Sequence, residues 1–254
     1  MDPRLAASPK HNRQGAPKGA PLFSGVMQMT QLRLHRDLSF CRVDGHLIFL
    51  DIQNDRYFRL GGCLESALVT YLDNGDAPAS SIRRLIERNI LIEKPVDSDH
   101  TPLLFTKTPT RSAMEEEVVH ASRTSVSEWL DTLAIVCSIR RQLKTHGLKQ
   151  VLWRLASLRG KRTSRLSTSC PNESHVLEAA AAFRSARLYV PIDTCCLLDS
   201  IAMIKFLAKR ELYADLVFGV TGDPFSAHSW AQLGTTVLND SVGHTSAFTP
   251  IRVI

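Results

Sequence analysis

The sequence predicts an α+β protein in which a small β-meander with helices precedes a larger half of helices followed by strands. Three observations indicate this class. Asp44-Gly45 separates two β-rich runs, residues 38–43 and 46–52, and both turn residues tolerate positive φ. Residues 63–72 carry apolar side chains at helical spacing. Beyond residue 125, helix-like stretches come first and strand-like stretches follow.

The N-terminal part is predicted to be a binding module. Residues 1–28 are rich in Pro, Gly, Ala and basic residues without periodicity, so we expect a disordered tail. A turn at Asn54-Asp55 leads to a third strand at 56–60, and a second helix is expected at 80–89. Residues 30–95 therefore form one predicted unit, with helices on one face of the meander and no catalytic set of side chains.

Residues 96–122 are predicted to be a linker, and residues 123–254 a second domain. This domain is expected to begin with three helices, at residues 125–145, 147–158 and 173–187, the first two separated around His146-Gly147.

The charge distribution of the chain indicates which classes of binding partner to expect. The formal charge is +6 and the pI about 9.1, and residues 139–166 hold nine Lys or Arg and no acidic residue. This stretch is either a solvated helix face or a docking surface for an acidic protein or peptide. Nucleic acid is not expected, because the stretch has little aromatic interleaving and no nucleic-acid motif.

The cysteines and the hydropathy indicate a cytoplasmic protein. Six cysteines are scattered without paired spacing, which is typical of a reducing compartment, and no signal peptide is visible. No apolar run approaches the roughly 20 residues that cross a bilayer, so no membrane association is expected. No Cys or His pair has metal-ligand spacing, and no phosphate-binding Gly loop occurs, so no metal or cofactor is expected.

A helix is predicted to begin just after Pro191, with Asp193 or Thr194 as its N-cap. Cys195 and Cys196 then fall in the first turn, where unpaired N–H groups and the helix dipole stabilise a thiolate. A cysteine in this position is either packing or a nucleophile. The second interpretation requires a base and an orienting group.

A predicted hairpin further along supplies both groups. If Gly234 is the centre of a three-residue loop, His228 lies directly across from Asp240 on one face. A two-residue Gly234-Thr235 turn would instead place His228 opposite Ser241. A carboxylate against an imidazole fixes its tautomer, as in Cys–His catalysis.

These residues resemble the transglutaminase-like cysteine peptidase of lasso peptide biosynthesis, the B protein family. The family pattern is C-L-x-x-S, a later A-H-x-W, and an Asp twelve residues after the His. This chain has Cys196 with Ser200, the stretch Ala227–Trp230, and Asp240. The match covers roughly residues 125–254 and selects Cys196 over Cys195. Cys63 begins a similar C-L-E-S stretch, but no A-H-x-W follows it, and we interpret Cys63 as core.

The resemblance implies a papain/transglutaminase-like fold for the second domain and a winged-helix-like, PqqD-like recognition element at residues 30–95. The protein would cleave the leader from a ribosomal lasso precursor before an asparagine-synthetase-like cyclase closes the ring. Leader binding would use an edge strand near residues 56–60, and the candidate leader-binding residues are Tyr57, Phe58, Arg83 and Arg84. Arg88 on the same helix could also meet acidic leader residues.

The resemblance also assigns roles: Cys196 attacks the scissile carbonyl, His228 moves the proton, and Asp240 orients His228. Two alternatives stay open. One is another acyl-transfer enzyme with the same three residues, such as a transglutaminase or amidase. The other is a non-catalytic peptide-binding scaffold whose cysteine is packing.

Overall fold

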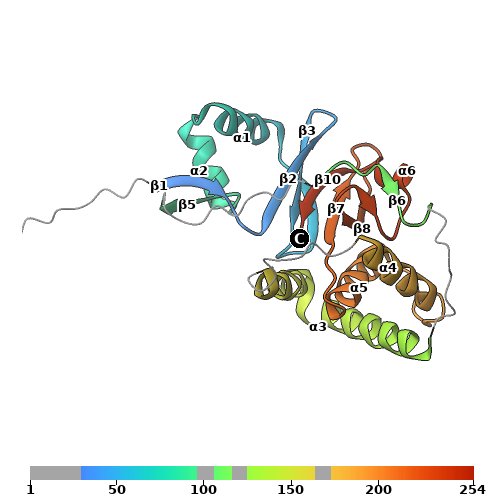
Figure 1. Ribbon diagram of the computed structural model, residues 1–254. Helices are drawn as coiled ribbons and strands as arrows, with labels where there is room; N and C mark the ends of the chain where they lie inside the picture. Colours follow the sequence, from blue (N-terminus) through green and yellow to red (C-terminus); the bar gives the residue numbers. More distant parts are fainter. Residues whose placement is uncertain (1–29, 96–105, 116–124, 164–172) are drawn as a thin grey trace, which may run out of the picture.

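The computed structural model describes residues 30–95, 106–115, 125–163 and 173–254 (Figure 1). Three sheets and several helices make up these stretches, which confirms the α+β class. The predicted tail, residues 1–28, lies outside the described residues. No helix in the four described stretches has the length and apolar character needed to span a bilayer.

The predicted meander is present. Strands β2 (Leu38–Val43), β3 (His46–Asp51) and β4 (Arg56–Arg59) form an antiparallel sheet in the order β2-β3-β4. Asp44 and Gly45 join the first two with φ angles of 52° and 80°. Positive φ at both positions matches the twist of the flanking strands, so the Asp-Gly hairpin is confirmed. In this order, β4 lies at an edge of the sheet.

Two helices, α1 (Gly62–Asn74) and α2 (Ala79–Glu87), pack on one face of this sheet. The buried residues of this contact include Leu47, Phe49, Leu64, Leu68 and Leu85. Helix α1 ends at Gly75, which adopts φ 74° and donates its N–H to the Tyr71 carbonyl at 2.8 Å. Glycine takes this left-handed conformation without a Cβ penalty, which explains the stop.

A second, two-stranded sheet closes the N-terminal module. Strand β1 (Thr30–Leu34) pairs antiparallel with β5 (Leu91–Pro95), so that Leu34 lies opposite Leu91. The sequence pattern does not predict either strand, because each is short and the two lie at opposite ends of the module's sequence.

The meander is buried on both faces. Side chains alternate along a strand, so Leu47 and Phe49 of β3 face the helices while Ile48 and Leu50 face the other way. That second pair belongs to the same hydrophobic core as the C-terminal half, together with Ile52. The module therefore packs directly against the rest of the chain (Figure 1).

Polar contacts reinforce this junction. Lys149 Nζ donates to Asp37 Oδ2 and to Gln53 Oε1, both at 2.7 Å. A Cβ placed on Gly222 would lie 1.8 Å from Asp44 Oδ2, so any larger residue would force the Asp44 carboxylate to move away from this junction.

The C-terminal half is built on a five-stranded sheet of order β10-β7-β8-β9-β6. Its strands are β6 (Arg111–Ser112), β7 (Asp215–Val220), β8 (Ala227–Leu233), β9 (Thr236–Val237) and β10 (Thr249–Val253). Neighbours are antiparallel except β6, which runs parallel to β9. Because β6 falls within residues 96–122, the predicted linker contains a segment that completes the sheet.

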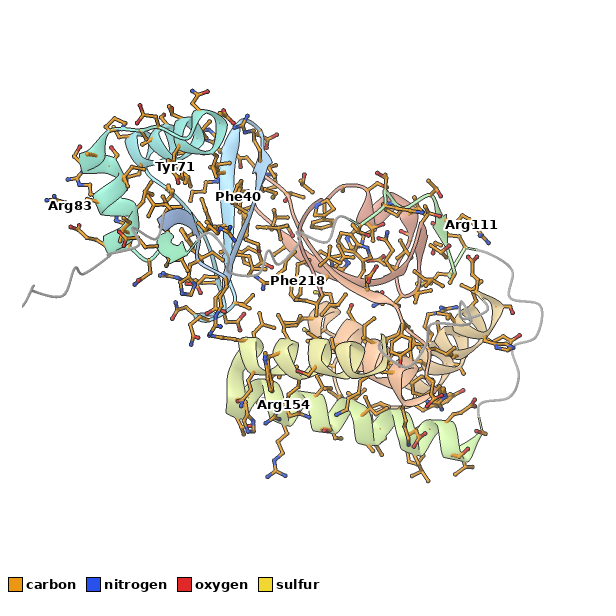
Figure 2. The ribbon with its side chains drawn as sticks, turned by 60° about the vertical axis from the view of Figure 1, so that its left-hand side comes forward. Phe40, Tyr71, Arg83, Arg111, Arg154 and Phe218 are labelled. Atoms are coloured by element: carbon orange, nitrogen blue, oxygen red, sulfur yellow. The ribbon has the colours of Figure 1, made fainter. Side chains whose placement is uncertain are left out.

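Three helices cover one face of this sheet (Figures 1 and 2): α3 (Val126–Thr163), α4 (Glu173–Arg187) and α5 (Cys196–Lys209). Gly147 interrupts α3 with φ 74° and ψ 171°, which confirms the predicted break. Helix α5 is the most buried of the three and packs on β8. Its N-terminus is thereby fixed against the sheet.

Candidate active site

Cys196 is the first residue of α5. The N-cap is Cys195 in extended conformation, and its side chain makes no capping bond, so the predicted cap at Asp193 or Thr194 is wrong. Instead, the Asp199 carboxylate reaches back and accepts the Cys195 backbone N–H at 3.2 Å. An acceptor from the next turn satisfies an otherwise unpaired N–H group, as in a capping box. Both cysteines are exposed.

Arg187 holds the segment that leads into this helix start. Its side chain is 8% exposed and donates to Asp199 Oδ1 at 2.7 Å. The same guanidinium donates to the carbonyls of Val190, Ile192 and Asp193 at 3.3, 2.9 and 3.1 Å. A planar donor set of this kind can fix a loop and a carboxylate together. The sequence carries no local signal for this role, because the partners are set by the fold of the loop.

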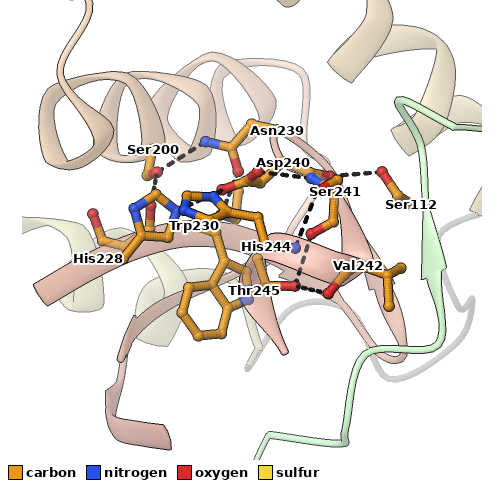
Figure 3. Close-up of polar contacts among 12 residues, drawn as sticks. Ser112, Ser200, His228, Trp230, Asn239, Asp240, Ser241, Val242, His244 and Thr245 are labelled. Carbon is orange, nitrogen blue, oxygen red and sulfur yellow. Dashed lines mark hydrogen bonds and ion pairs between the residues drawn. The ribbon is translucent and has the colours of Figure 1, made fainter. Parts of the chain in front are cut away.

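Ser200 lies one turn after Cys196 and is fully buried. Its Oγ donates to the Ser229 carbonyl and accepts from Asn239 Nδ2, both at 2.9 Å (Figure 3). Ser229 follows His228 in the chain, and Asn239 precedes Asp240. One hydroxyl therefore connects the helix of the cysteine with the strand of the histidine and the segment of the aspartate.

The hairpin register differs from the predicted one. Gln232 pairs with Val237, so the turn is the two-residue Gly234-Thr235 alternative. In that register His228 would not face Asp240 if the strand continued. Strand β9 ends at Val237, however, and the chain then leaves regular pairing.

Asn239 causes the departure. The Ala231 N–H donates to the Asn239 Oδ1 at 2.8 Å, rather than to a strand carbonyl. The Leu238 carbonyl accepts instead from Arg184 at 2.6 Å. Because the Asn239 side chain takes the place of a strand carbonyl as the acceptor, the chain bends after β9. Asp240 therefore reaches His228 despite the unfavourable register.

His228 and Asp240 are in direct contact. His228 Nε2 lies 2.5 Å from Asp240 Oδ2, and 2.8 Å separates the same oxygen from Nδ1 of His244 (Figure 3). The other oxygen of Asp240 accepts the Ser241 N–H at 2.7 Å. His244 belongs to the short helix α6 (Val242–Thr245) and was not among the predicted site residues. The only sequence signal for it is the i, i+4 spacing from Asp240.

Burial governs the charge of His228. It lowers the pKa of the imidazole below its ordinary 6.5, and the nearby His244 adds to this effect, while the hydrogen bond and charge of Asp240 oppose it. The ring lies 5.1 Å from Phe248 and 6.0 Å from Trp230, centroid to centroid. A neutral imidazole whose Nε2 is held by a carboxylate leaves Nδ1 as the available base.

The third predicted residue, Cys196, is placed by the helix. Residues i and i+4 share a helix face, so Cys196 lies on the side of α5 from which Ser200 bonds to β8. In the described part of the chain, the thiol makes no hydrogen bond to His228. The structure thus joins two of the three predicted residues directly and places the third at the end of the helix that packs on them.

The other candidate cysteine, Cys63, was interpreted as core. The structure contradicts this, because Cys63 is exposed on the first turn of α1.

Tyr57 and Phe58 point to opposite sides of β4. Tyr57 packs against the core of the C-terminal half, and its ring lies 5.6 Å from that of Phe225. Burial raises the pKa of Tyr57 to about 12, and electrostatic repulsion from Asp55, Cys196 and Cys41 adds to the rise.

Phe58 lines a groove of about 570 Å³ beside the edge strand. The groove runs between β4 and the end of α2, and three arginines line it: Arg56, Arg59 and Arg88. The predicted leader-binding residues Arg83 and Arg84 are exposed on α2 and are not among the groove-lining residues. Figure 2 places Arg83 at the end of the module that is far from the C-terminal half.

Comparison with known proteins agrees with this geometry. Residues 143–253 match the family model described as the transglutaminase-like superfamily. A stretch of 71 residues is 35% identical to the Microcin J25-processing protein McjB of Escherichia coli, covering 28% of this chain and 34% of that protein. The chain thus spans about a third of the length of this curated relative. No solved structure matches the chain significantly. The stretch 143–253 is therefore similar to the transglutaminase-like superfamily, and Cys196, His228 and Asp240 all lie within it.

Proposed function

We propose that this chain is a cysteine peptidase that removes the leader from a lasso precursor peptide before a partner cyclase closes the ring. One observation carries the proposal: within the stretch similar to the transglutaminase-like superfamily, His228 lies on the strand on which the Cys196 helix packs, and it is hydrogen-bonded to Asp240. The partial similarity to a microcin-processing protein supports a peptide substrate.

The mechanism follows from the two nitrogens of His228. Asp240 engages Nε2, so Nδ1 takes the proton from the Cys196 thiol. The thiolate attacks the scissile carbonyl, and the imidazolium then gives its proton to the departing amine. Water, activated by the same nitrogen, hydrolyses the thioester and restores the thiol. The backbone N–H of Cys196, in the unpaired first turn of α5, is placed to donate to the oxyanion.

The N-terminal module would recognise the leader as a PqqD-like element. An extended peptide can add to the free edge of β4, where main-chain hydrogen bonds give affinity and the adjoining groove gives specificity. Arg56, Arg59 and Arg88 favour acidic leader side chains there. Phe58 also lines this groove, so strand β4 would supply both the pairing edge and part of the surface that gives specificity.

A second candidate is amine transfer rather than hydrolysis, because the matched family is transglutaminase-like. Both reactions share the thioester and differ in the acceptor that resolves it.

One experiment separates these activities. The full chain is incubated with a lasso precursor peptide, with and without an added primary amine, and the products are analysed by mass spectrometry. Cleavage between leader and core by the parent, and none by Cys196→Ala, is the expected result. Amine incorporation without leader loss would favour the transferase, and an intact peptide in both samples would leave only the scaffold interpretation.

A further inference from the structure

Three metal-binding side chains converge beside the proposed nucleophile. The donor atoms of His228, Asp240 and His244 all lie within 4.8 Å of one another. They come from strand β8, the segment after β9, and helix α6. The three residues do not form a short sequence motif, because His228 lies on β8 whereas Asp240 and His244 follow β9.

The donor set suits zinc. Two imidazoles and one carboxylate form a donor set found at zinc sites, and the two imidazoles disfavour the hard cations Mg²⁺ and Ca²⁺. Three protein ligands also leave a fourth tetrahedral position for water.

The geometry needs only a small adjustment. Asp240 Oδ2 is 2.5 Å from the His228 nitrogen and 2.8 Å from the His244 nitrogen, as hydrogen-bonded atoms are. Zinc bonds of about 2.0–2.1 Å in a tetrahedral site hold ligand atoms about 3.3 Å apart. The His228 and Asp240 side chains must therefore separate by about 0.8 Å. His244 can follow, because its side chain is 53% exposed on a four-residue helix.

Two further contacts orient the Asp240 ligand. The Ser241 N–H donates to the second Asp240 oxygen at 2.7 Å, and Ser112 Oγ donates to the Asp240 carbonyl at 2.6 Å. Such outer contacts orient metal ligands. The exposed side of His244 gives an ion access from solvent.

We propose that His228 Nε2, Asp240 Oδ2 and His244 Nδ1 form a Zn²⁺ site whose occupation reversibly inhibits the enzyme. A neutral imidazole bound to zinc through Nε2 carries its proton on Nδ1. That nitrogen then has no lone pair to accept the Cys196 proton. The ion also takes the Asp240 oxygen that orients the ring. Inhibition rests on the proposed function, whereas metal binding does not.

Metal binding is tested without activity. The full-length Cys196→Ala variant, which removes the thiol as a competing ligand, is stripped with chelator and titrated with Zn²⁺ against a chromophoric chelator. We expect one bound equivalent. Adding His244→Gln should weaken binding by more than about tenfold, whereas His175→Gln, an exposed histidine on α4, should leave it unchanged.

Thermal melting verifies that each variant is folded. Asp240→Asn is a second variant in which a zinc-binding side chain is removed. The site is disproved if Cys196→Ala does not bind zinc, or if His244→Gln and Asp240→Asn both bind as tightly as the parent.

Inhibition is measured on the chain with its thiol, each variant relative to its own zinc-free rate. Zn²⁺ should suppress leader cleavage and EDTA restore it, and His244→Gln should need more than about tenfold more zinc for the same fractional loss. Zinc binding without inhibition, or equal inhibition of His244→Gln, overturns the inhibitory role. A chain that binds zinc but never cleaves precursor refutes the proposed function and leaves the metal site intact.

Discussion

The buried hydroxyl of Ser200 accepts a hydrogen bond from the Asn239 side-chain amide at 2.9 Å, and so ties the Cys196 helix to the segment that carries Asp240. The same oxygen donates to the Ser229 carbonyl, next to His228. Ser200 therefore acts on the proposed chemistry through position, because each of its partners is a chain neighbour of a predicted catalytic residue.

Replacement of Ser200 by Ala should lower kcat for leader cleavage more than it changes KM. The change removes the shared hydroxyl and leaves two buried polar partners unsatisfied, so the free energy of unfolding should also fall by about 1–3 kcal/mol. Steady-state kinetics and denaturant unfolding measure the two effects. Ser157→Ala is the matched control, since its Oγ bonds only to a carbonyl of its own helix on the surface. Lost stability with an unchanged kcat would reduce Ser200 to a structural residue.

Replacing each of the two adjacent cysteines should have clearly different effects on cleavage. Cys196→Ala should abolish cleavage while leader affinity, followed by fluorescence anisotropy of a labelled leader, stays unchanged. Cys195→Ala should be mild, because the N-cap side chain makes no capping bond. The opposite pattern, with the greater loss at Cys195, would overturn the assignment of the nucleophile.

Activity should fall on the acid side as His228 becomes protonated. Burial lowers the pKa of this imidazole below 6.5, so the acid limb of kcat/KM should lie below pH 6.5. His244→Gln should move the limb to higher pH, because it removes a neighbouring positive charge that lowers the pKa of His228. A limb that stays in place in this variant would contradict the coupling of the two rings.

The same group makes stability depend on pH. The native state binds this proton less readily than the unfolded chain, so between 6.5 and the lowered native pKa the unfolded state carries more protons. The contribution of His228 to the free energy of unfolding is therefore fully favourable above pH 6.5 and declines as the pH falls through that window. Urea unfolding at several pH values, compared with His228→Gln, isolates this contribution.

Leader affinity should depend on Arg88 more than on Arg83. Arg88 lines the groove beside β4, whereas Arg83 lies outside that lining on the exposed face of α2. Arg88→Gln should weaken binding of an acidic leader several-fold, with the loss reduced at high salt, and Arg83→Gln should have little effect. Equal losses in the two variants would point to nonspecific attraction by the basic surface.

Several elements follow from local sequence. Asp44-Gly45 specifies its hairpin because both residues tolerate positive φ, and Gly147 interrupts α3 for the same reason. The start of α5 was located to within two residues, although the capping acceptor is Asp199 rather than a preceding side chain. Each of these depends on a few neighbouring residues whose conformational preferences can be read directly.

The site required more than local sequence. The pattern of residues identified Cys196, His228 and Asp240 as candidates, but the strand register that was expected to join the last two is wrong. Their contact depends on Asn239, whose side chain replaces a strand acceptor and bends the chain. His244, Arg187 and the β1–β5 pairing were likewise not predicted.

By itself, the sequence determined the meander, the main helices and the C-terminal hairpin, their order, and which side chains had the chemistry for a thiol–imidazole–carboxylate site. Only the tertiary structure decided how those side chains meet, which arginines line the groove, and that the N-terminal sheet is buried on both faces. The physical reason is the sequence separation of the interacting residues. Turns and caps depend on residues a few positions apart. Buried hydrogen bonds and sheet packing join segments that approach one another only when the chain folds.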